Sequence, residues 1–148
     1  MCIRDSLPTF RSALLVSARL MSDQINTILE PYSLNYSLWQ VLHTIHFKHS
    51  CTSIDIAEYL NISKPAVAKR IHILIELELL EQIDTEDKRQ KMLTLSSKGL
   101  SLFEQCSSCI DQFEYSLIRH IEPEQLALVR ATLELVLKQL QDSKRGAI

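Results

Sequence analysis

The segment LNISKPAV, residues 60–67, constrains the fold more than any other part of the sequence. Ser63 is a good helix cap, because its hydroxyl can accept an amide hydrogen that the first helical turn leaves unpaired. Pro65 suits the same turn, where its missing N–H costs nothing. A short helix starting at Thr52 or Ser53 comes before this segment. The pattern therefore predicts a helix, a tight turn and a second helix.

The second helix, predicted from Ser63 to about Leu79, has two different faces. At roughly 100° per residue, Val67, Ile71 and Leu74 fall together on one side, which we predict to be the core side. The other side carries Pro65, Lys69, His72 and Glu76, flanked by Ala66 and Ile73. Its N-terminal half is basic and sterically small. It therefore suits entry into the major groove of DNA, where Lys or Arg can meet guanine edges or phosphates.

Charge is distributed unevenly around this unit, although the formal net charge of the chain is only −2. Residues 61–75 contain three bases and no acid, and residues 76–87 contain six acids and no base. The bases Lys88, Arg89 and Lys91 come next. Two cationic patches are thus separated by an acidic block. A protein surface does not need such a segregated pattern of charges merely to be solvated.

A hairpin is predicted directly after the second helix. The polar stretch TEDKRQ is flanked by apolar residues with strand-like spacing, namely Ile83, Met92, Leu93 and Leu95. Arg89 lies at the tip of this hairpin, and the negative potential of a narrow minor groove favours an inserted arginine. Asp87 is close enough to orient its guanidinium. Because an exposed ion pair is worth only ~0–1 kcal/mol, we expect the pair to position Arg89 rather than to stabilise the fold.

Apolar residues at steps of three and four predict four further helices. One runs from Phe10 to Ile28 and stops at Pro31, and another covers roughly residues 37–47. A third follows Ser96 as its cap, and the last opens at Pro123. The apolar stripes of these last two helices are Phe103, Cys106, Ile110, Phe113, Leu117 and Ile121, and Leu126, Val129, Leu133, Val136 and Leu140. Both stripes are nearly heptad, so we expect partner helices along their length.

The sequence resembles the MarR family of bacterial winged helix-turn-helix regulators over nearly all of residues 7–143. The resemblance rests on SLWQVLHTI, on NISKPAVAKRIHILIELELLE and above all on DTEDKRQKMLTLSSKG, which follows the family's wing pattern. It implies a mainly α fold, in which a three-helix core and a two-stranded β wing form a winged helix-turn-helix. That DNA-binding lobe would span residues 36–96. Residues 7–30 and 97–143 would form N- and C-terminal dimerisation helices, and residues 144–148 a tail.

The resemblance also implies a function, that of a homodimeric transcriptional regulator, expected to be a repressor. Its two lobes would read a pseudopalindromic double-stranded DNA operator with half-sites ~34–36 Å apart. The implied DNA contacts are Ser63, Lys64, Pro65, Ala66, Lys69, Arg70, His72, Asp87, Lys88 and Arg89, with Arg70 the most structural of the helix bases. The sequence departs from the family at Ala66, Ala68, Ile73 and Glu78, where relatives often carry Thr, Ser, a basic residue and Gly. Fewer hydrogen-bonding groups therefore face the bases.

Small aromatic or phenolic effectors are typical of the family, which implies a possible effector wall at Tyr36, Trp39 and His43. The alternative is a helical metal- or thiol-sensing protein on the same scaffold, suggested by CSSC at 106–109 and by His43, His46 and His49. Cys106 lies in an apolar stripe, so we predict buried packing for it. The histidines show no four-ligand spacing, and no metal site or cofactor is predicted.

Other function classes have little support in the sequence. Two glycines are too few for a Gly-rich phosphate cradle, and no nucleophile motif is present, so we do not expect an enzyme. With 148 residues, of which 46% are hydrophobic, the chain fits one ordinary domain. No apolar run approaches the ~20 residues of a membrane span, and no secretory leader is visible, so we expect a cytoplasmic protein without a membrane partner.

Residues 1–6, MCIRDS, match the translation of a sequencing-library transposon end. We predict that they are a non-native leader and leave them out of the fold.

Overall fold

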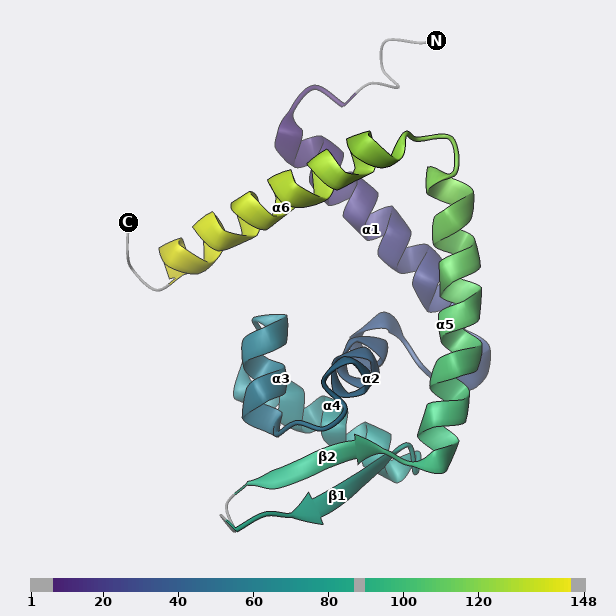
Figure 1. The fold of residues 1–148 in the computed structure, drawn as a ribbon, viewed down its shortest axis with the longest axis vertical. Coiled ribbons are helices and arrows are strands. Elements are labelled where there is room, and N and C mark those ends of the chain that lie inside the picture. The colour runs from purple at the N-terminus through teal and green to yellow at the C-terminus, as the bar shows by residue number, and fades with distance from the viewer. Residues whose placement is uncertain (1–6, 87–89, 145–148) are drawn as a thin grey trace. The chain divides into compact units, whose positions relative to one another are not determined.

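The computed structural model describes residues 7–86 and 90–144 and confirms the mainly α fold with a two-stranded antiparallel sheet (Figure 1). The predicted leader, residues 1–6, and the predicted wing-tip residues 87–89 lie outside the described residues. In chain order the elements are α1 (Phe10–Leu29), the 3-10 turn η2 (Glu30–Tyr32), α2 (Tyr36–Lys48), α3 (Ser53–Leu60), α4 (Lys64–Glu76), β1 (Leu80–Asp84), β2 (Lys91–Leu95), α5 (Ser97–Ile118) and α6 (Pro123–Lys144).

The chain divides into two compact units, residues 1–110 and residues 111–148. The first unit holds α1 to α4, both strands and the first part of α5, and the second holds the rest of α5 and α6. Among the described residues, no helix is both long enough and apolar enough to cross a lipid bilayer.

Helix α2 is the centre of the first unit, where it contacts α1, α3, α4 and β2. Its residues Val41, Leu42 and Ile45 are completely buried. Thr44 is buried too, and its hydroxyl donates a hydrogen bond of 2.7 Å to the carbonyl of Gln40, so this polar group is satisfied inside the helix. A helix that is apolar on several sides must be covered on several sides, which fixes the arrangement of its neighbours.

Side-chain amides hold the start of α2 in place. The N-cap residue Asn35 accepts a hydrogen bond of 2.9 Å from the amide of Leu38. Asn26 of α1 accepts a second, of 2.7 Å, from the amide of Tyr36. Both bonds satisfy first-turn amides that a helix cannot satisfy itself. The join between α1 and α2 is therefore fixed by hydrogen bonds as well as by packing.

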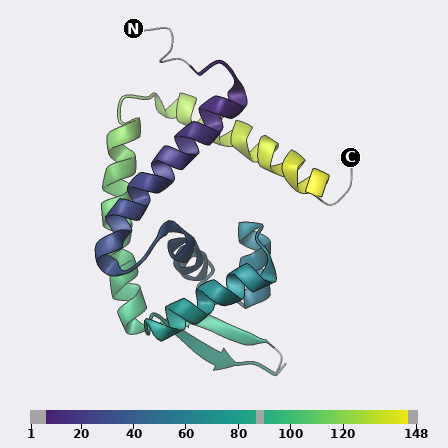
Figure 2. The ribbon, with the colours of Figure 1, turned by 180° about the vertical axis from the view of Figure 1, so that it is seen from behind.

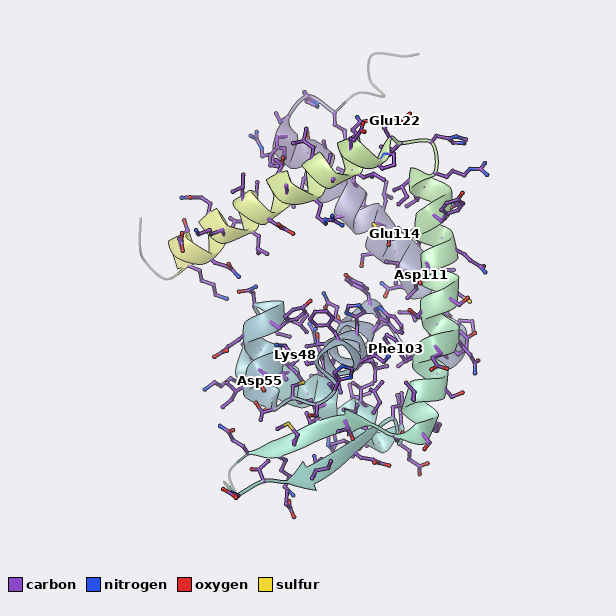
Figure 3. The ribbon with its side chains drawn as sticks, in the orientation of Figure 1. Lys48, Asp55, Phe103, Asp111, Glu114 and Glu122 are labelled. Atoms are coloured by element: carbon purple, nitrogen blue, oxygen red, sulfur yellow. The ribbon has the colours of Figure 1, made fainter. Side chains whose placement is uncertain are left out.

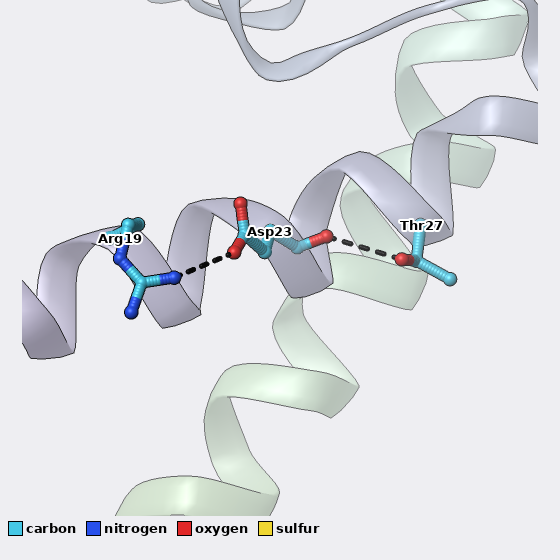
Figure 4. Close-up of polar contacts among 3 residues, drawn as sticks. All are labelled: Arg19, Asp23 and Thr27. Carbon is cyan, nitrogen blue, oxygen red and sulfur yellow. Dashed lines mark hydrogen bonds and ion pairs between the residues drawn. The ribbon is translucent and has the colours of Figure 1, made fainter.

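Part of α1 is polar and exposed. Arg19 and Asp23 form an ion pair of 3.4 Å one turn apart, and the Thr27 hydroxyl donates to the Asp23 carbonyl at 3.2 Å (Figure 4). Exposed pairs of this kind contribute little stability.

The predicted helix-turn-helix is confirmed. Thr52 caps α3 and forms a reciprocal capping box with Asp55, at 3.2 and 2.9 Å. Asn61 then takes the left-handed conformation, with φ 56°, which ends α3 and turns the chain sharply. Ser63 caps α4 as predicted, and Pro65 lies in its first turn. Local chemistry alone therefore leaves only three residues between the end of α3 and the start of α4.

The wing is a regular antiparallel pair in which Leu80 faces Leu95 and Asp84 faces Lys91. An isolated bridge adds a third segment, because Cys51 and Leu93 exchange backbone hydrogen bonds of 3.2 and 2.8 Å. The sequence did not predict this bridge, since a single paired residue leaves no alternating pattern. This bridge connects the loop before α3 to Leu93, the central residue of β2.

Helix α4 is shorter than predicted, because it ends at Glu76 and not near Leu79. The amides of Leu79 and Glu78 donate to the carbonyls of Leu74 and Ile75 at 3.0 and 2.9 Å, which is a Schellman end. Glu78 sits in the left-handed region, with φ 62°. The reversal there allows Leu80 to begin β1 and so connects α4 directly to the wing.

Helix α5 begins against this reversal. The Ser96 hydroxyl accepts from the amide of Gly99 at 2.9 Å, which confirms the predicted cap. A Cβ atom on Gly99 would overlap the carbonyl oxygen of Leu79, so only glycine allows this close approach. The stripe residues Phe103, Cys106 and Ile110 are buried in the first unit.

The second unit leaves most of its apolar side chains uncovered. Its helix α6 contains no buried residue. The expected partner helices for this stripe remain a prediction.

We predict that Glu78→Gly raises the free energy of unfolding by about 0.5–1 kcal/mol, because glycine adopts the left-handed conformation without steric cost. Urea denaturation would measure this change. Glu76→Gly is the matched control: it removes a similar charge at a position with ordinary helical geometry and should destabilise by a comparable amount. A loss of stability in Glu78→Gly would show that the side chain, not the backbone, governs this turn.

Candidate nucleic-acid interface

Helix α4 presents a core face and an exposed face, as predicted. Val67, Ile71 and Leu74 are buried. The opposite face consists of the exposed residues Lys64, Pro65, Ala68, Lys69, His72 and Glu76, with Ala66 and Ile73 half-buried at its edges. Seen from behind, α4 lies in front of α2 and α3 (Figure 2). The structure therefore brings Lys64, Pro65, Lys69 and His72 onto one accessible surface, whereas Arg70, also a predicted contact, bonds to α2.

The first turn of α4 is electropositive for two reasons. The Ser63 hydroxyl accepts only the amide of Ala66, at 3.3 Å, so other first-turn amides of the helix keep their partial positive charge. Lys64 adds a full charge, and the first turn contains no acidic residue. Such a terminus attracts anions, phosphate groups included.

Arg70 has a different role from its basic neighbours. Its Nη1 donates to the carbonyl of Ser37 and to Oε1 of Gln40, both at 3.2 Å. The guanidinium therefore links α4 to the first turns of α2. The sequence indicated that Arg70 is the most structural of the helix bases, but its partners could not be found there because they lie 33 and 30 residues earlier.

His72 and Glu76 form an exposed pair one turn apart, with 3.0 Å between Nε2 and Oε1. One of the two ring nitrogens of His72 is therefore paired with the Glu76 carboxylate. Glu76 also marks the point along α4 where the exposed face changes from basic to acidic.

In the wing, Lys91 pairs with Asp84 across the strands, with 3.3 Å between Nζ and Oδ1. This is the pair of residues next to the tip. Asp87, Lys88 and Arg89, the predicted wing contacts, lie outside the described residues.

Of the implied effector wall, Trp39 is buried and belongs to an aromatic stack. Its ring lies parallel to that of Phe103 at 4.7 Å, and His46 stacks on the same Phe103 ring at 4.1 Å. Phe103 points from α5 toward α2 (Figure 3). His43 is exposed and tilts against Trp39 at 6.4 Å, and Tyr36 is half-buried. The stack serves packing between α2 and α5.

A cavity of about 250 Å³ lies between the first turn of α2 and the edge of α4. Leu38 and Ile73 supply apolar lining, and Lys69 and Arg70 supply cationic lining. The sequence did not predict this cavity, because its two walls are distant along the chain.

The cysteines of CSSC differ in their surroundings. Cys106 is completely buried, and burial, followed by the nearby Cys109, raises the pKa of its thiol to about 11. Cys109 is exposed, and its thiol raises the pKa of the neighbouring Tyr32 phenol. The predicted burial of Cys106 is confirmed. Within the described ranges, no group of three or more His, Cys, Asp or Glu side chains is arranged to hold a metal ion.

Comparisons with known proteins agree with this geometry. The sequence model described as MarR family matches residues 32–90. An uncharacterised HTH-type transcriptional regulator of Bacillus subtilis (strain 168), YwoH, is 32% identical over 108 residues, which are 73% of this chain and 79% of that protein. Among solved structures, Staphylococcus aureus MarR in complex with salicylate and kanamycin is 26% identical, with a TM-score of 0.80 over 90% of this chain and 91% of that one. The S. aureus MepR–DNA complex is 22% identical, with a TM-score of 0.81 over 90% and 99% of the two chains, and shows the same fold.

We predict that Arg70→Ala lowers the free energy of unfolding by about 1 kcal/mol, because two hydrogen bonds between α4 and α2 are lost. Urea denaturation measures the change. Lys69→Ala removes the neighbouring charge without those bonds and should change the stability by less than about 0.5 kcal/mol. Equal effects of the two substitutions would contradict the linking role of Arg70.

The cysteines should react with iodoacetamide in a fixed order. At pH 8 a thiol with a pKa of about 11 is ionised in only about one molecule in a thousand, and only the thiolate reacts. We therefore expect Cys109 to be alkylated in the native protein, and Cys51 and Cys106 only after unfolding, as followed by peptide mass spectrometry. Rapid native alkylation of Cys106 would contradict its burial and would favour a thiol-sensing role.

Proposed function

Because the chain belongs to the MarR family of transcriptional regulators, we propose that it binds a specific double-stranded DNA operator as a homodimer and represses transcription from it. The observation that carries the proposal is the exposed face of α4. Its N-terminal half is basic and sterically small, and its core face holds it on a packed helical unit. A rigid helix of this kind can enter a major groove with a fixed orientation.

In this proposal, the N-terminal half of α4 provides both phosphate and base contacts. The electropositive first turn, with Ser63 and Lys64, binds backbone phosphate. Pro65, Ala66 and Lys69 face the base edges, with His72 at the far limit of the contact. Arg70 positions the helix through α2, in keeping with its two hydrogen bonds. The acids from Glu76 onward stay away from the duplex.

The wing provides the second contact. Its strands end at Asp84 and resume at Lys91, on either side of the tip that the sequence predicts. We assign Arg89 to the minor groove beside the α4 contact, with Asp87 orienting it and Lys88 on phosphate.

Dimerisation would use residues 7–30 and 97–143. The support is the uncovered apolar stripe of α6, where Val129, Leu133 and Leu140 are exposed. An apolar helix face of this length is typical of an interface between subunits. A two-fold dimer would place its two α4 helices on half-sites ~34–36 Å apart.

An effector would act by binding one state of the dimer more tightly than the other. The S. aureus MarR complex contains salicylate, a small aromatic acid. For this chain we propose a small aromatic or phenolic effector near Tyr36, Trp39 and His43, of which His43 is exposed. Its action is regulatory, not enzymatic, and takes place on DNA in the cytoplasm.

We predict that Arg89→Ala weakens operator binding roughly 10- to 100-fold, since contacts of this type are worth ~1–3 kcal/mol. Fluorescence anisotropy would measure the dissociation constant. Thermal unfolding should stay native-like, because the substitution falls in the predicted polar tip. Lys144→Ala is a charge-matched control at the exposed end of α6, outside the proposed dimerisation residues, and should bind DNA normally.

Salt provides an independent check on the same complex. Neutralising some 6–10 phosphates costs ~10³–10⁵ in affinity between ~50 and 200 mM salt. Wild-type affinity in a well-folded Arg89→Ala protein would refute the wing assignment.

A further inference from the structure

The side chains on the exposed face of α4 can recognise only a few features of DNA bases. In residues 64–69 the exposed or half-buried side chains are Lys64, Pro65, Ala66, Ala68 and Lys69. Three of these five end in carbon and have no hydrogen-bonding atom. The two lysines can only donate hydrogen bonds, because an ammonium group has no lone pair.

The residues beside this stretch do not supply the missing groups. The Ser63 hydroxyl accepts from the amide of Ala66 with one lone pair, and the proposed function assigns its remaining hydrogen-bonding capacity to a backbone phosphate. Arg70 donates to α2 and is thereby turned away from the outer face. His72 is the first outer side chain with a ring nitrogen that can accept, and it pairs with Glu76. Adenine is read by the two-point hydrogen bonding of Asn or Gln, and the described face of α4 offers neither residue.

Only a few base features in the major groove match such a surface. A lysine can donate to the O6 and N7 atoms of guanine or to a phosphate. The single apolar group that bases present in this groove is the C5-methyl group of thymine. Small apolar side chains such as alanine recognise it by contact, because the contact removes both surfaces from water.

We infer that α4 reads its operator mainly through thymine methyl groups, which pack against Pro65, Ala66 and Ala68, with Lys69 directed to a neighbouring guanine or phosphate. This inference rests on the proposed function and names the base class that the helix selects. It gives a purpose to the alanines at positions 66 and 68. They are the complementary surface for methyl groups, and a polar side chain without a methyl group there would lose that contact.

Deoxyuridine tests the inference directly, because it differs from thymidine only by the C5-methyl group. The full chain would first enrich its preferred duplex from a random pool. The enriched duplex would then be synthesised with thymidine or with deoxyuridine in the half-sites. We expect binding to weaken about three- to fivefold for each contacted methyl group that is lost, from ~0.8 kcal/mol per buried carbon group. The minor-groove edge is unchanged, so the wing contact is not disturbed.

The Ala68→Gly variant separates a methyl contact from an effect of deoxyuridine on DNA shape. Removing the Ala68 methyl should reduce the penalty for deoxyuridine, because one partner of the contact is already absent. Glu58→Gly, at an exposed position of α3 outside the proposed dimerisation and contact residues, is the control for the helix-weakening effect of glycine and should retain the full penalty.

The outcomes are distinguishable. A total penalty below twofold, or the same penalty in Ala68→Gly as in the wild type, would overturn the methyl inference and leave the proposed function standing. Failure of the chain to enrich any sequence would instead contradict the proposed function.

Discussion

The burial of α2 is the constraint on which the first unit depends. This helix contacts α1, α3, α4 and β2, and its buried residues Val41, Leu42 and Ile45 leave no room for another arrangement of those neighbours. Interiors are packed as densely as organic crystals, so a shift of α2 must displace the helices around it. The hydrogen bonds of Arg70 reinforce this coupling at the outer edge of α4. The orientation of the exposed face of α4 is thus set largely by a helix that does not itself form that face.

The coupling explains how a regulator with this fold can be switched. The implied effector residues and the partners of Arg70 are all on α2, within residues 36–43. A ligand that favours one position of α2 would therefore also favour one orientation of α4, without touching the DNA-binding surface. Such a switch requires a ligand with different affinities for the two positions, since equal affinities shift no population.

Most elements were predictable from the sequence, because local chemistry determines them. Ser63 and Pro65 fixed the start of α4, and the spacing of Val67, Ile71 and Leu74 fixed its core face. The predictions failed where geometry depends on distant contacts. The helix ends early because Glu78 takes a left-handed conformation, which the reversal into β1 requires and which its residue type disfavours.

The candidate site was likewise only partly predictable from the sequence. Its basic face was visible in the sequence, but the partners of Arg70, the bridge between Cys51 and Leu93 and the cavity beside Lys69 were not. Each of these joins segments that are far apart along the chain. No periodic pattern records such a contact.

The most direct test of the central claim is lysine footprinting with and without DNA. The protein would be labelled with an amine-reactive reagent alone and with duplex DNA from upstream of its own gene, and each lysine quantified by mass spectrometry. The account predicts that DNA protects Lys64 and Lys69, while Lys138 on α6 is labelled equally in both samples. Equal labelling of Lys64 and Lys69 with the DNA demonstrably bound would show that α4 is not the interface.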